Sequence, residues 1–121
     1  MIFKLAELYA LTRSLPKLTQ KELPIKTSFK LLKFLKRSSE EIEIAEKTRI
    51  KLVEKYAKER KDGEEMKVAD ENREKFQEEF SSLIEEEVNI DFELISIEEL
   101  GNISVSAMDL VPLEKIIKEK M

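Results

Sequence analysis

Residues 25–60 contain neither Gly nor Pro, the two residues that interrupt helices most readily. Most positions in this stretch hold Lys, Glu, Leu, Ala or Arg, which favour the helical conformation. At 100° of rotation per residue, apolar side chains recur on one side of such a helix: Leu31, Leu35, Ile42, Val53, Tyr56 and Ala57. The stretch therefore predicts one long helix, along which the rest of this 121-residue chain has to pack.

Two polar features interrupt the apolar stripe. Glu46 and Arg49 lie within it, and their spacing of three residues allows them to pair with each other or with a neighbouring helix. Ser38 and Ser39 form the weakest point of the predicted helix, because Ser favours the helix less than its neighbours do.

A second helix follows a predicted turn. Asp62-Gly63 is a turn signal, so residues 61–67 are expected to form a loop, and Asp70 is a candidate N-cap. The second helix is expected to run to about Glu87, with four apolar side chains on one face: Phe76, Phe80, Leu83 and Ile84. Two helices joined by a short loop should pack as an antiparallel hairpin.

The regions before and after the hairpin combine short strands and helices. Residues 2–5 are a possible strand, and residues 7–15 are a short helix that Pro16 ends or kinks. Leu23-Pro24 marks the boundary before the long helix. Residues 88–94 alternate strictly between apolar and polar side chains, the pattern of a half-buried strand.

The last quarter of the chain carries two capping patterns. Ser96 and Glu99 match a capping box, and Gly101 can close the turn that the box opens. Residues 103–105 are a possible second short strand. A second box, Ser106 with Asp109, predicts a final helix towards Lys120, which Pro112 would kink or delay.

These elements predict an α+β fold that is predominantly helical. A long antiparallel helical hairpin, about residues 25–87, is expected to pack with a small two- or three-stranded sheet and a C-terminal helix in the part 88–121. The length suits a single domain, residues 1–121, and 41% hydrophobic residues can supply its core. A content of only 2 Gly and 3 Pro argues against an all-β fold with many hairpins.

The composition excludes several kinds of chemistry. The chain has no His and no Cys, which removes His-dependent triads, thiolate catalysis, Cys- or His-ligated zinc and disulfides. Gly63 and Gly101 are its only glycines, so no phosphate-binding glycine motif can be written. We expect no enzymatic activity, no catalytic residue, no metal ligand and no cofactor.

Clustered carboxylates leave a two-carboxylate hydrolase or an Mg²⁺ or Ca²⁺ site as alternatives. The clustered residues are Glu40, Glu41, Glu43, Glu46, Glu85, Glu86 and Glu87. They fall on Lys-rich helix surfaces, where carboxylates are ordinarily solvated. We therefore interpret these carboxylates as part of a charged, solvated helix surface.

Charge is distributed unevenly along the chain. The net charge is −4, but residues 1–38 carry +7 and residues 68–121 carry −10. A basic row lies on the long helix: Lys26, Lys30, Lys33 and Arg37. An acidic row lies on the second helix: Glu71, Glu74, Glu78 and Glu85. The two rows can meet within one molecule or between two copies, and the sequence leaves both arrangements open.

Nucleic-acid binding by the basic row is an alternative that other features oppose. The pI is about 5.1, and no motif of a known nucleic-acid module is present. Phe29 and Phe34 fit a core or an interface better than a base-stacking surface.

The segment 31–35 is apolar on nearly all sides, and in a domain of this size one side of it is expected to lack an internal partner. Leu31, Phe34 and Leu35 are therefore the candidate contact with a protein partner. The alternative is that the N-terminal and C-terminal helices cover both sides of the segment.

Four stretches of the chain resemble a family of small, uncharacterised phage and prophage proteins of Gram-positive bacteria. They are IFKLAEL near the start, LPIKTSFKLLKFL, TRIKLVEKYAKE and the C-terminal VNIDFELISIEELGNISVSAMDLVPLEKII. The resemblance implies a phage-encoded accessory protein without enzymatic activity, and it brings no catalytic residues.

Together these features favour a protein-binding factor of the phage cycle, associated with the virion or with its assembly and self-associating. The alternative is an inhibitor of a host enzyme or immune complex that presents the acidic surface. The expected location is the cytoplasm of the infected or lysogenic bacterium, or the virion. No membrane contact is expected, because the apolar runs are short and interrupted by charges.

Overall fold

The computed structural model describes residues 1–57 and 67–119. In chain order its elements are β1 (Ile2–Lys4), α1 (Leu5–Ser14), α2 (Pro16–Thr19), α3 (Ile25–Tyr56), the 3₁₀ turn η1 (Asp70–Asn72), α4 (Arg73–Ile84), β2 (Glu87–Asn89), β3 (Ile95–Ser96), η2 (Glu98–Leu100), α5 (Ala107–Leu110), the 3₁₀ turn η3 (Val111–Ile116) and β4 (Ile117–Lys118). The fold is α+β and predominantly helical, as the sequence predicts.

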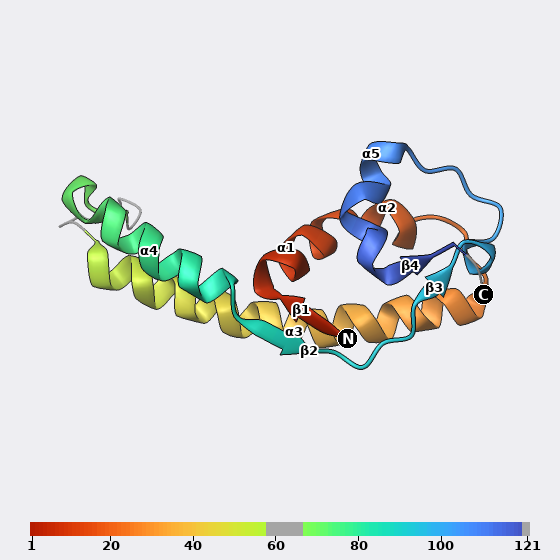
Figure 1. The fold of residues 1–121 in the computed structure, drawn as a ribbon, viewed down its shortest axis with the longest axis horizontal. Coiled ribbons are helices and arrows are strands. Elements are labelled where there is room, and N and C mark those ends of the chain that lie inside the picture. Colours follow the sequence, from red (N-terminus) through yellow and green to blue (C-terminus); the bar gives the residue numbers. More distant parts are fainter. Residues whose placement is uncertain (58–66, 120–121) are drawn as a thin grey trace.

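Helix α3 forms the spine of the molecule (Figure 1). Its first half runs beneath a body made of α1, α2, α5, η3, β3 and β4, and β1 and β2 cross the middle of the helix in this view. Its second half extends away from that body and carries α4 alongside it, so that the two helices form a projecting arm. We call the first part the body and the second part the arm. The long helical hairpin predicted from the sequence is present.

The long helix begins and ends for identifiable reasons. Pro24 precedes it at the N-cap position with an extended backbone, in agreement with the boundary predicted at Leu23-Pro24. The helix ends at Tyr56, earlier than the predicted residue 60, because Ala57 adopts an extended conformation and forms an isolated antiparallel bridge with Val68. The Ser38-Ser39 pair does not break the helix. The Ser38 side chain is buried, and its hydroxyl is satisfied because it donates to the carbonyl of Leu35.

The second helix is shorter than predicted. It runs over Arg73–Ile84, and Asp70 begins the preceding 3₁₀ turn instead of capping α4. The helix stops at Ile84 because the chain then enters a sheet: the carbonyl of Glu86 accepts a hydrogen bond from the amide of Leu5. The predicted loop at 61–67 lies outside the described residues, except for Lys67.

The first sheet pairs the start of the chain with the segment after the hairpin. β1 and β2 are antiparallel, with Phe3 opposite Val88. The predicted strand over 88–94 is mostly wrong, because β1 provides partners only for Glu87–Asn89. The alternation predicted the faces of the segment correctly. Ile90 is buried and Phe92 is half-buried, whereas the acidic residues between and beside them are exposed.

The C-terminal part differs most from the sequence prediction. Residues 103–105 form no strand; instead β3 pairs in parallel with β4, with Ile95 opposite Ile117. The final helix is only the short α5, which Ser106 caps by accepting from the amide of Asp109. Pro112 lies at the start of η3, where its missing N–H costs nothing, and the chain continues as a 3₁₀ turn instead of a long α-helix.

The core lies in the body, between α1, the first half of α3 and η3. Phe34 is its central aromatic residue, with its ring 5.5 Å from that of Phe3 and 4.9 Å from that of Phe92. Leucines from α1 and α2 and Leu113 from η3 are buried around it. In contrast, α4 has no buried residue. The body is therefore the well-packed part of the molecule, and the arm is held by half-buried contacts.

Candidate interaction surface

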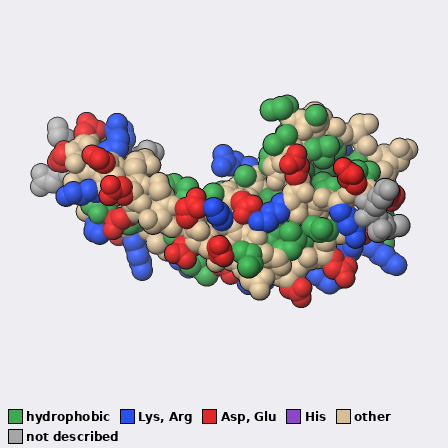
Figure 2. Space-filling model, in the orientation of Figure 1, with side chains coloured by type: hydrophobic (Ala, Val, Ile, Leu, Met, Phe, Trp, Pro, Cys, Tyr) green, Lys and Arg blue, Asp and Glu red, His purple; other side chains and the backbone are tan. Residues whose placement is uncertain are grey.

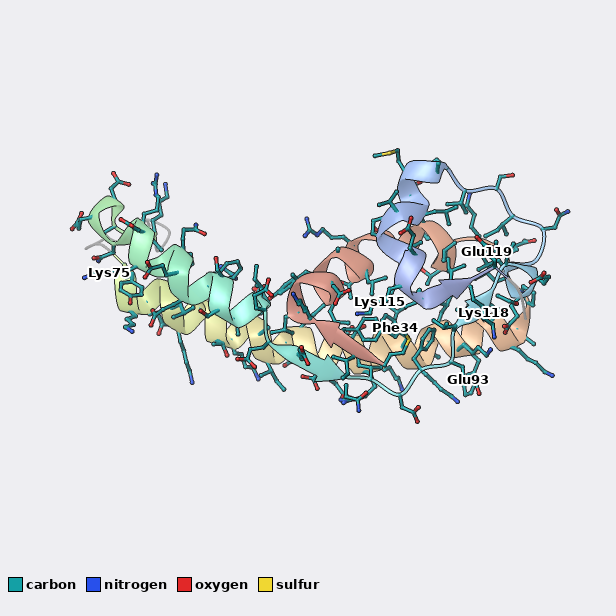
Figure 3. The ribbon with its side chains drawn as sticks, in the orientation of Figure 1. Phe34, Lys75, Glu93, Lys115, Lys118 and Glu119 are labelled. Carbon is teal, nitrogen blue, oxygen red and sulfur yellow. The ribbon has the colours of Figure 1, made fainter. Side chains whose placement is uncertain are left out.

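The predicted partner contact at Leu31 and Phe34 is wrong. Each of these side chains is only 1% exposed, and both belong to the core of the body. Leu35 is half-buried and packs against the same core. Figure 3 shows Phe34 on the side of α3 that faces the body. Within the described residues, one side of the segment does lack an internal partner, as the sequence predicts, but it is the side of Leu32, which is 49% exposed. The alternative in which the N-terminal and C-terminal helices cover both sides is therefore wrong as well.

The rotation of α3 that buries Leu31 and Phe34 is accompanied by a polar network on the same side of the helix. The Thr27 hydroxyl donates to the carbonyl of Glu99, and the Lys30 ammonium pairs with the Glu99 carboxylate at 2.7 Å. Glu99 also accepts from the amide of Ser96 and completes the predicted capping box. The hydrogen bond to Glu99 raises the pKa of Lys30, and the bond from Lys30 lowers the pKa of Glu99. Thr27 and Lys30 thereby anchor the start of α3 to η2, on the same side of the helix as the buried Leu31 and Phe34.

The same rotation places other apolar side chains in solvent. Ile25 is 82% exposed, Phe29 is 56% exposed and Leu32 is 49% exposed. Their spacing of four and three residues puts them on one side of α3, the side that does not face the body. We call these three residues the apolar row. Large apolar side chains gathered on a solvent-exposed helix face are typical of a protein contact.

Positive charges flank the apolar row. Lys26 and Lys36 are exposed beside it, and the Lys33 ammonium lies 4.7 Å from the centroid of the Phe29 ring. A cation over an aromatic face is attracted by the ring quadrupole. The surface around the apolar row therefore combines apolar area with positive charge.

Two of the four residues in the predicted basic row form ion pairs within the chain. Lys26 and Lys33 are exposed, but Lys30 is bound to Glu99 and also lies 3.7 Å from Glu93. Arg37 pairs along its own helix with Glu40 at 3.2 Å and with Glu41 at 3.4 Å. The four residues thus do not act as one open cationic surface.

The predicted acidic row lies on the arm, and its four residues are exposed: Glu71, Glu74, Glu78 and Glu85. Glu85 pairs with Lys4 at 2.8 Å, which ties the base of the arm to β1. Among the described residues, no ion pair joins the acidic row to the basic row. Figure 2 shows acidic and basic side chains intermingled along the visible face of the arm.

A hydrogen-bonded group joins the arm to the body. The Tyr9 hydroxyl of α1 donates to the Glu46 carboxylate of α3 at 2.8 Å, and Arg49 donates to the same carboxylate at 2.9 Å. The ion pair between Glu46 and Arg49 that their spacing allows is therefore present. Partial burial and the bond to Glu46 raise the pKa of Tyr9 to about 12, and the bonds from Tyr9 and Arg49 lower the pKa of Glu46. This group is a structural joint between α1 and α3.

A shallow hollow of about 570 Å³ lies beside the second sheet. Its lining is mainly aliphatic, with Glu114, Lys118 and Glu119 as the charged members. Within the described part of the chain, no group of three or more carboxylates lies close enough together to hold a metal ion. The hollow therefore offers mainly apolar surface.

No protein family, curated protein or solved structure matches this chain. Within residues 1–57 and 67–119, no helix is long and apolar enough to cross a membrane.

The apolar row was missed in the sequence, although its signal was present. Ile25, Phe29 and Leu32 have helical spacing, but so do Leu31 and Leu35 on the opposite side. Periodicity alone cannot tell which of two apolar sides faces the core. That choice depends on which side the rest of the chain covers, and the covering residues are distant in sequence: Phe3 and Phe92 pack on Phe34, and Glu99 binds Thr27 and Lys30.

Proposed function

We propose that the protein is a non-enzymatic binding factor that associates with other protein chains through the exposed side of α3. The family resemblance adds that it is phage-encoded and acts in the virion or in its assembly. The observation that supports binding is the apolar row, Ile25, Phe29 and Leu32, which is solvent-exposed on the best-anchored helix of the body.

The anchoring makes this surface suitable for recognition. Core contacts and the bonds from Thr27 and Lys30 to Glu99 hold the first half of α3 in one orientation. The apolar row is thus presented on a rigid element, and binding does not require the surface to order itself first.

A pair of matched substitutions tests the proposal. Phe29→Glu places a charge in the apolar row, and Ile44→Glu places the same charge at another exposed position of α3. We expect Phe29→Glu to weaken association at least about tenfold, the effect of losing a central apolar contact worth 1–2 kcal/mol. Association is measured by light scattering for self-association and by capture from host lysate for other partners. Equal association of both variants and the unmodified protein in both assays contradicts the proposal.

One observation favours a second candidate, an inhibitor that presents negative charge to a basic host protein. Glu71, Glu74 and Glu78 are exposed together on the arm, away from the apolar row. This candidate predicts a salt-sensitive complex with a basic nuclease or polymerase. Triple substitution of these residues by Lys abolishes such a complex, whereas Phe29→Glu leaves it intact.

A further inference from the structure

The exposed side of α3 carries one continuous row of side chains that extends from the body onto the arm. Its members are separated by three or four residues, and all are exposed: Ile25, Phe29, Leu32, Lys36, Ser39, Glu43, Lys47 and Ile50. Alternating three- and four-residue spacing is the pattern along which two helices pack side by side. We call this row the outer face of α3. Apolar residues lie at its two ends and polar residues lie at its centre.

The outer face is complementary to itself when two copies run antiparallel. In the alignment where Phe29 of one copy meets Ile50 of the other, Ser39 lies next to the two-fold axis. Because the arrangement is symmetric, the contact between Phe29 and Ile50 is made twice. The aliphatic stem of Lys47 then covers Leu32 while its ammonium stays in solvent.

Charge complementarity supports the same alignment. Lys36 of one copy meets Glu43 of the other, again twice. Residues 25–37 hold five Lys or Arg and no acidic residue, whereas residues 40–54 hold five Glu and three Lys or Arg. An antiparallel pair places the positive first half of each α3 beside the more negative second half of its partner, whereas a parallel pair places positive beside positive.

The acidic row on the arm of a second copy is a poorer partner for the apolar row than the outer face is. Glu71, Glu74 and Glu78 lie on the exposed side of the arm, while the aromatic residues of α4, Phe76 and Phe80, stack on each other and are half-buried. A surface of carboxylates cannot cover Phe29 and Leu32. Contact between the basic row and the acidic row of another copy, an arrangement that the sequence leaves open, is therefore disfavoured.

We propose that the chain forms a two-fold symmetric dimer in which the outer faces of two α3 helices pack antiparallel, with Phe29 against Ile50 and Lys36 against Glu43. The partner of the apolar row is thus a second copy of this chain. This inference rests on the proposed function and specifies its first partner. The two arms of such a dimer project in opposite directions.

Cysteine cross-linking tests the arrangement, because the chain has no Cys of its own. Ser39→Cys places a thiol next to the axis, so the dimer brings two copies of it together. Thr48→Cys is the matched control, since Thr48 is also exposed on α3 but lies off the outer face. Under mild oxidation at micromolar concentration, we expect Ser39→Cys to form the disulfide-linked dimer at least about tenfold faster than Thr48→Cys. Equal rates for the two variants overturn the proposal.

A mixing experiment tests the direction of the helices. We expect a mixture of Phe29→Cys and Ile50→Cys to form the mixed disulfide faster than either variant forms its own dimer. Preferential self-linkage of each variant indicates a parallel pair and overturns the antiparallel alignment. Far-ultraviolet circular dichroism confirms that each variant is folded, and both positions are exposed, so the core is not disturbed.

The dimer and the proposed function can fail separately. If Ser39→Cys does not cross-link but Phe29→Glu abolishes the capture of another protein, the dimer is wrong and the binding function remains. If neither self-association nor capture depends on Phe29, both are wrong.

Discussion

Phe34 and Phe29 lie on the same helix and have opposite surroundings. Phe34 contacts two other aromatic rings in the core, while Phe29 contacts solvent and the ammonium of Lys33. The apolar character of both residues is evident in the sequence, but their different roles follow from long-range packing, since Phe3 and Phe92 cover Phe34 and no such residue in the described part of the chain covers Phe29. At the residue scale, the sequence gives the apolar positions, but it does not predict which of them the rest of the chain buries.

Alanine substitution separates these two roles. We expect Phe34→Ala to lower the free energy of unfolding by about 3–5 kcal/mol, because it leaves a cavity in the core. The same change at Phe29 should lower the stability of the monomer by no more than about 0.5 kcal/mol. Urea unfolding of both variants, in the dilute range where the chain is monomeric, measures the difference. A comparable loss at both positions contradicts the assignment of Phe34 to the core and of Phe29 to the surface.

The Tyr9 hydroxyl makes stability depend on alkaline pH. Its pKa is raised to about 12 in the folded protein, above the value near 10 for an exposed tyrosine, so the folded state holds the proton more tightly than the unfolded state. The stabilisation by Tyr9 is therefore complete below pH 10 and is lost as pH rises from 10 to 12. We expect the stability advantage of the unmodified protein over Tyr9→Phe to shrink across this interval. An advantage that stays constant with pH contradicts the role of the hydrogen bond to Glu46.

At the element scale, local signals predicted element types better than element lengths. The capping pattern of Ser96 with Glu99 and the positive φ of 73° at Gly101 are both present. The lengths of β2 and of the final helix were mispredicted, because the reach of β1 and the pairing of β3 with β4 set them. A strand needs a partner, and the partner is determined by tertiary structure.

Gly101, at the end of η2, has a backbone conformation that a residue with a side chain adopts only at a cost. Its φ of 73° with ψ of −146° belongs to a region that is essentially restricted to Gly, and an added Cβ would lie 3.1 Å from Cδ of Pro24. We expect Gly101→Ala to destabilise the protein by about 1–3 kcal/mol, the usual cost of such a backbone conformation. Asn102→Ala, at the exposed neighbouring position, is the control for urea unfolding. A loss no larger than that of the control contradicts this account of the turn.

The arm should open more easily than the body. No residue of α4 is buried, whereas α1 contributes Leu5, Leu8 and Leu11 to the core. Because local opening is easier where few apolar contacts are lost, we expect amides of α4 to exchange hydrogen about tenfold or more faster than those of α1. Hydrogen-exchange mass spectrometry measures both segments in one experiment. Equal protection of α1 and α4 contradicts the division into a packed body and a weaker arm.

At the scale of the whole molecule, the positive and the acidic regions of the sequence lie in different parts of the fold. The positive first half of α3 lies under the body, and the acidic row lies on the arm that α4 forms with the second half of α3 (Figure 1). The described residues of these two regions do not pair within one chain. An antiparallel dimer brings opposite charges together and covers Phe29 and Leu32 of the apolar row in the same contact.

The molar mass in solution, measured by light scattering on a sizing column, tests this central claim most directly. At micromolar concentration and low salt, we expect twice the 14.2 kDa of the chain, with the dimer fraction falling at high salt because Lys36 and Glu43 contribute to the contact. Phe29→Glu should elute at the mass of one chain, while Ile44→Glu should remain dimeric. A mass of one chain for the unmodified protein at every concentration and salt contradicts the dimer.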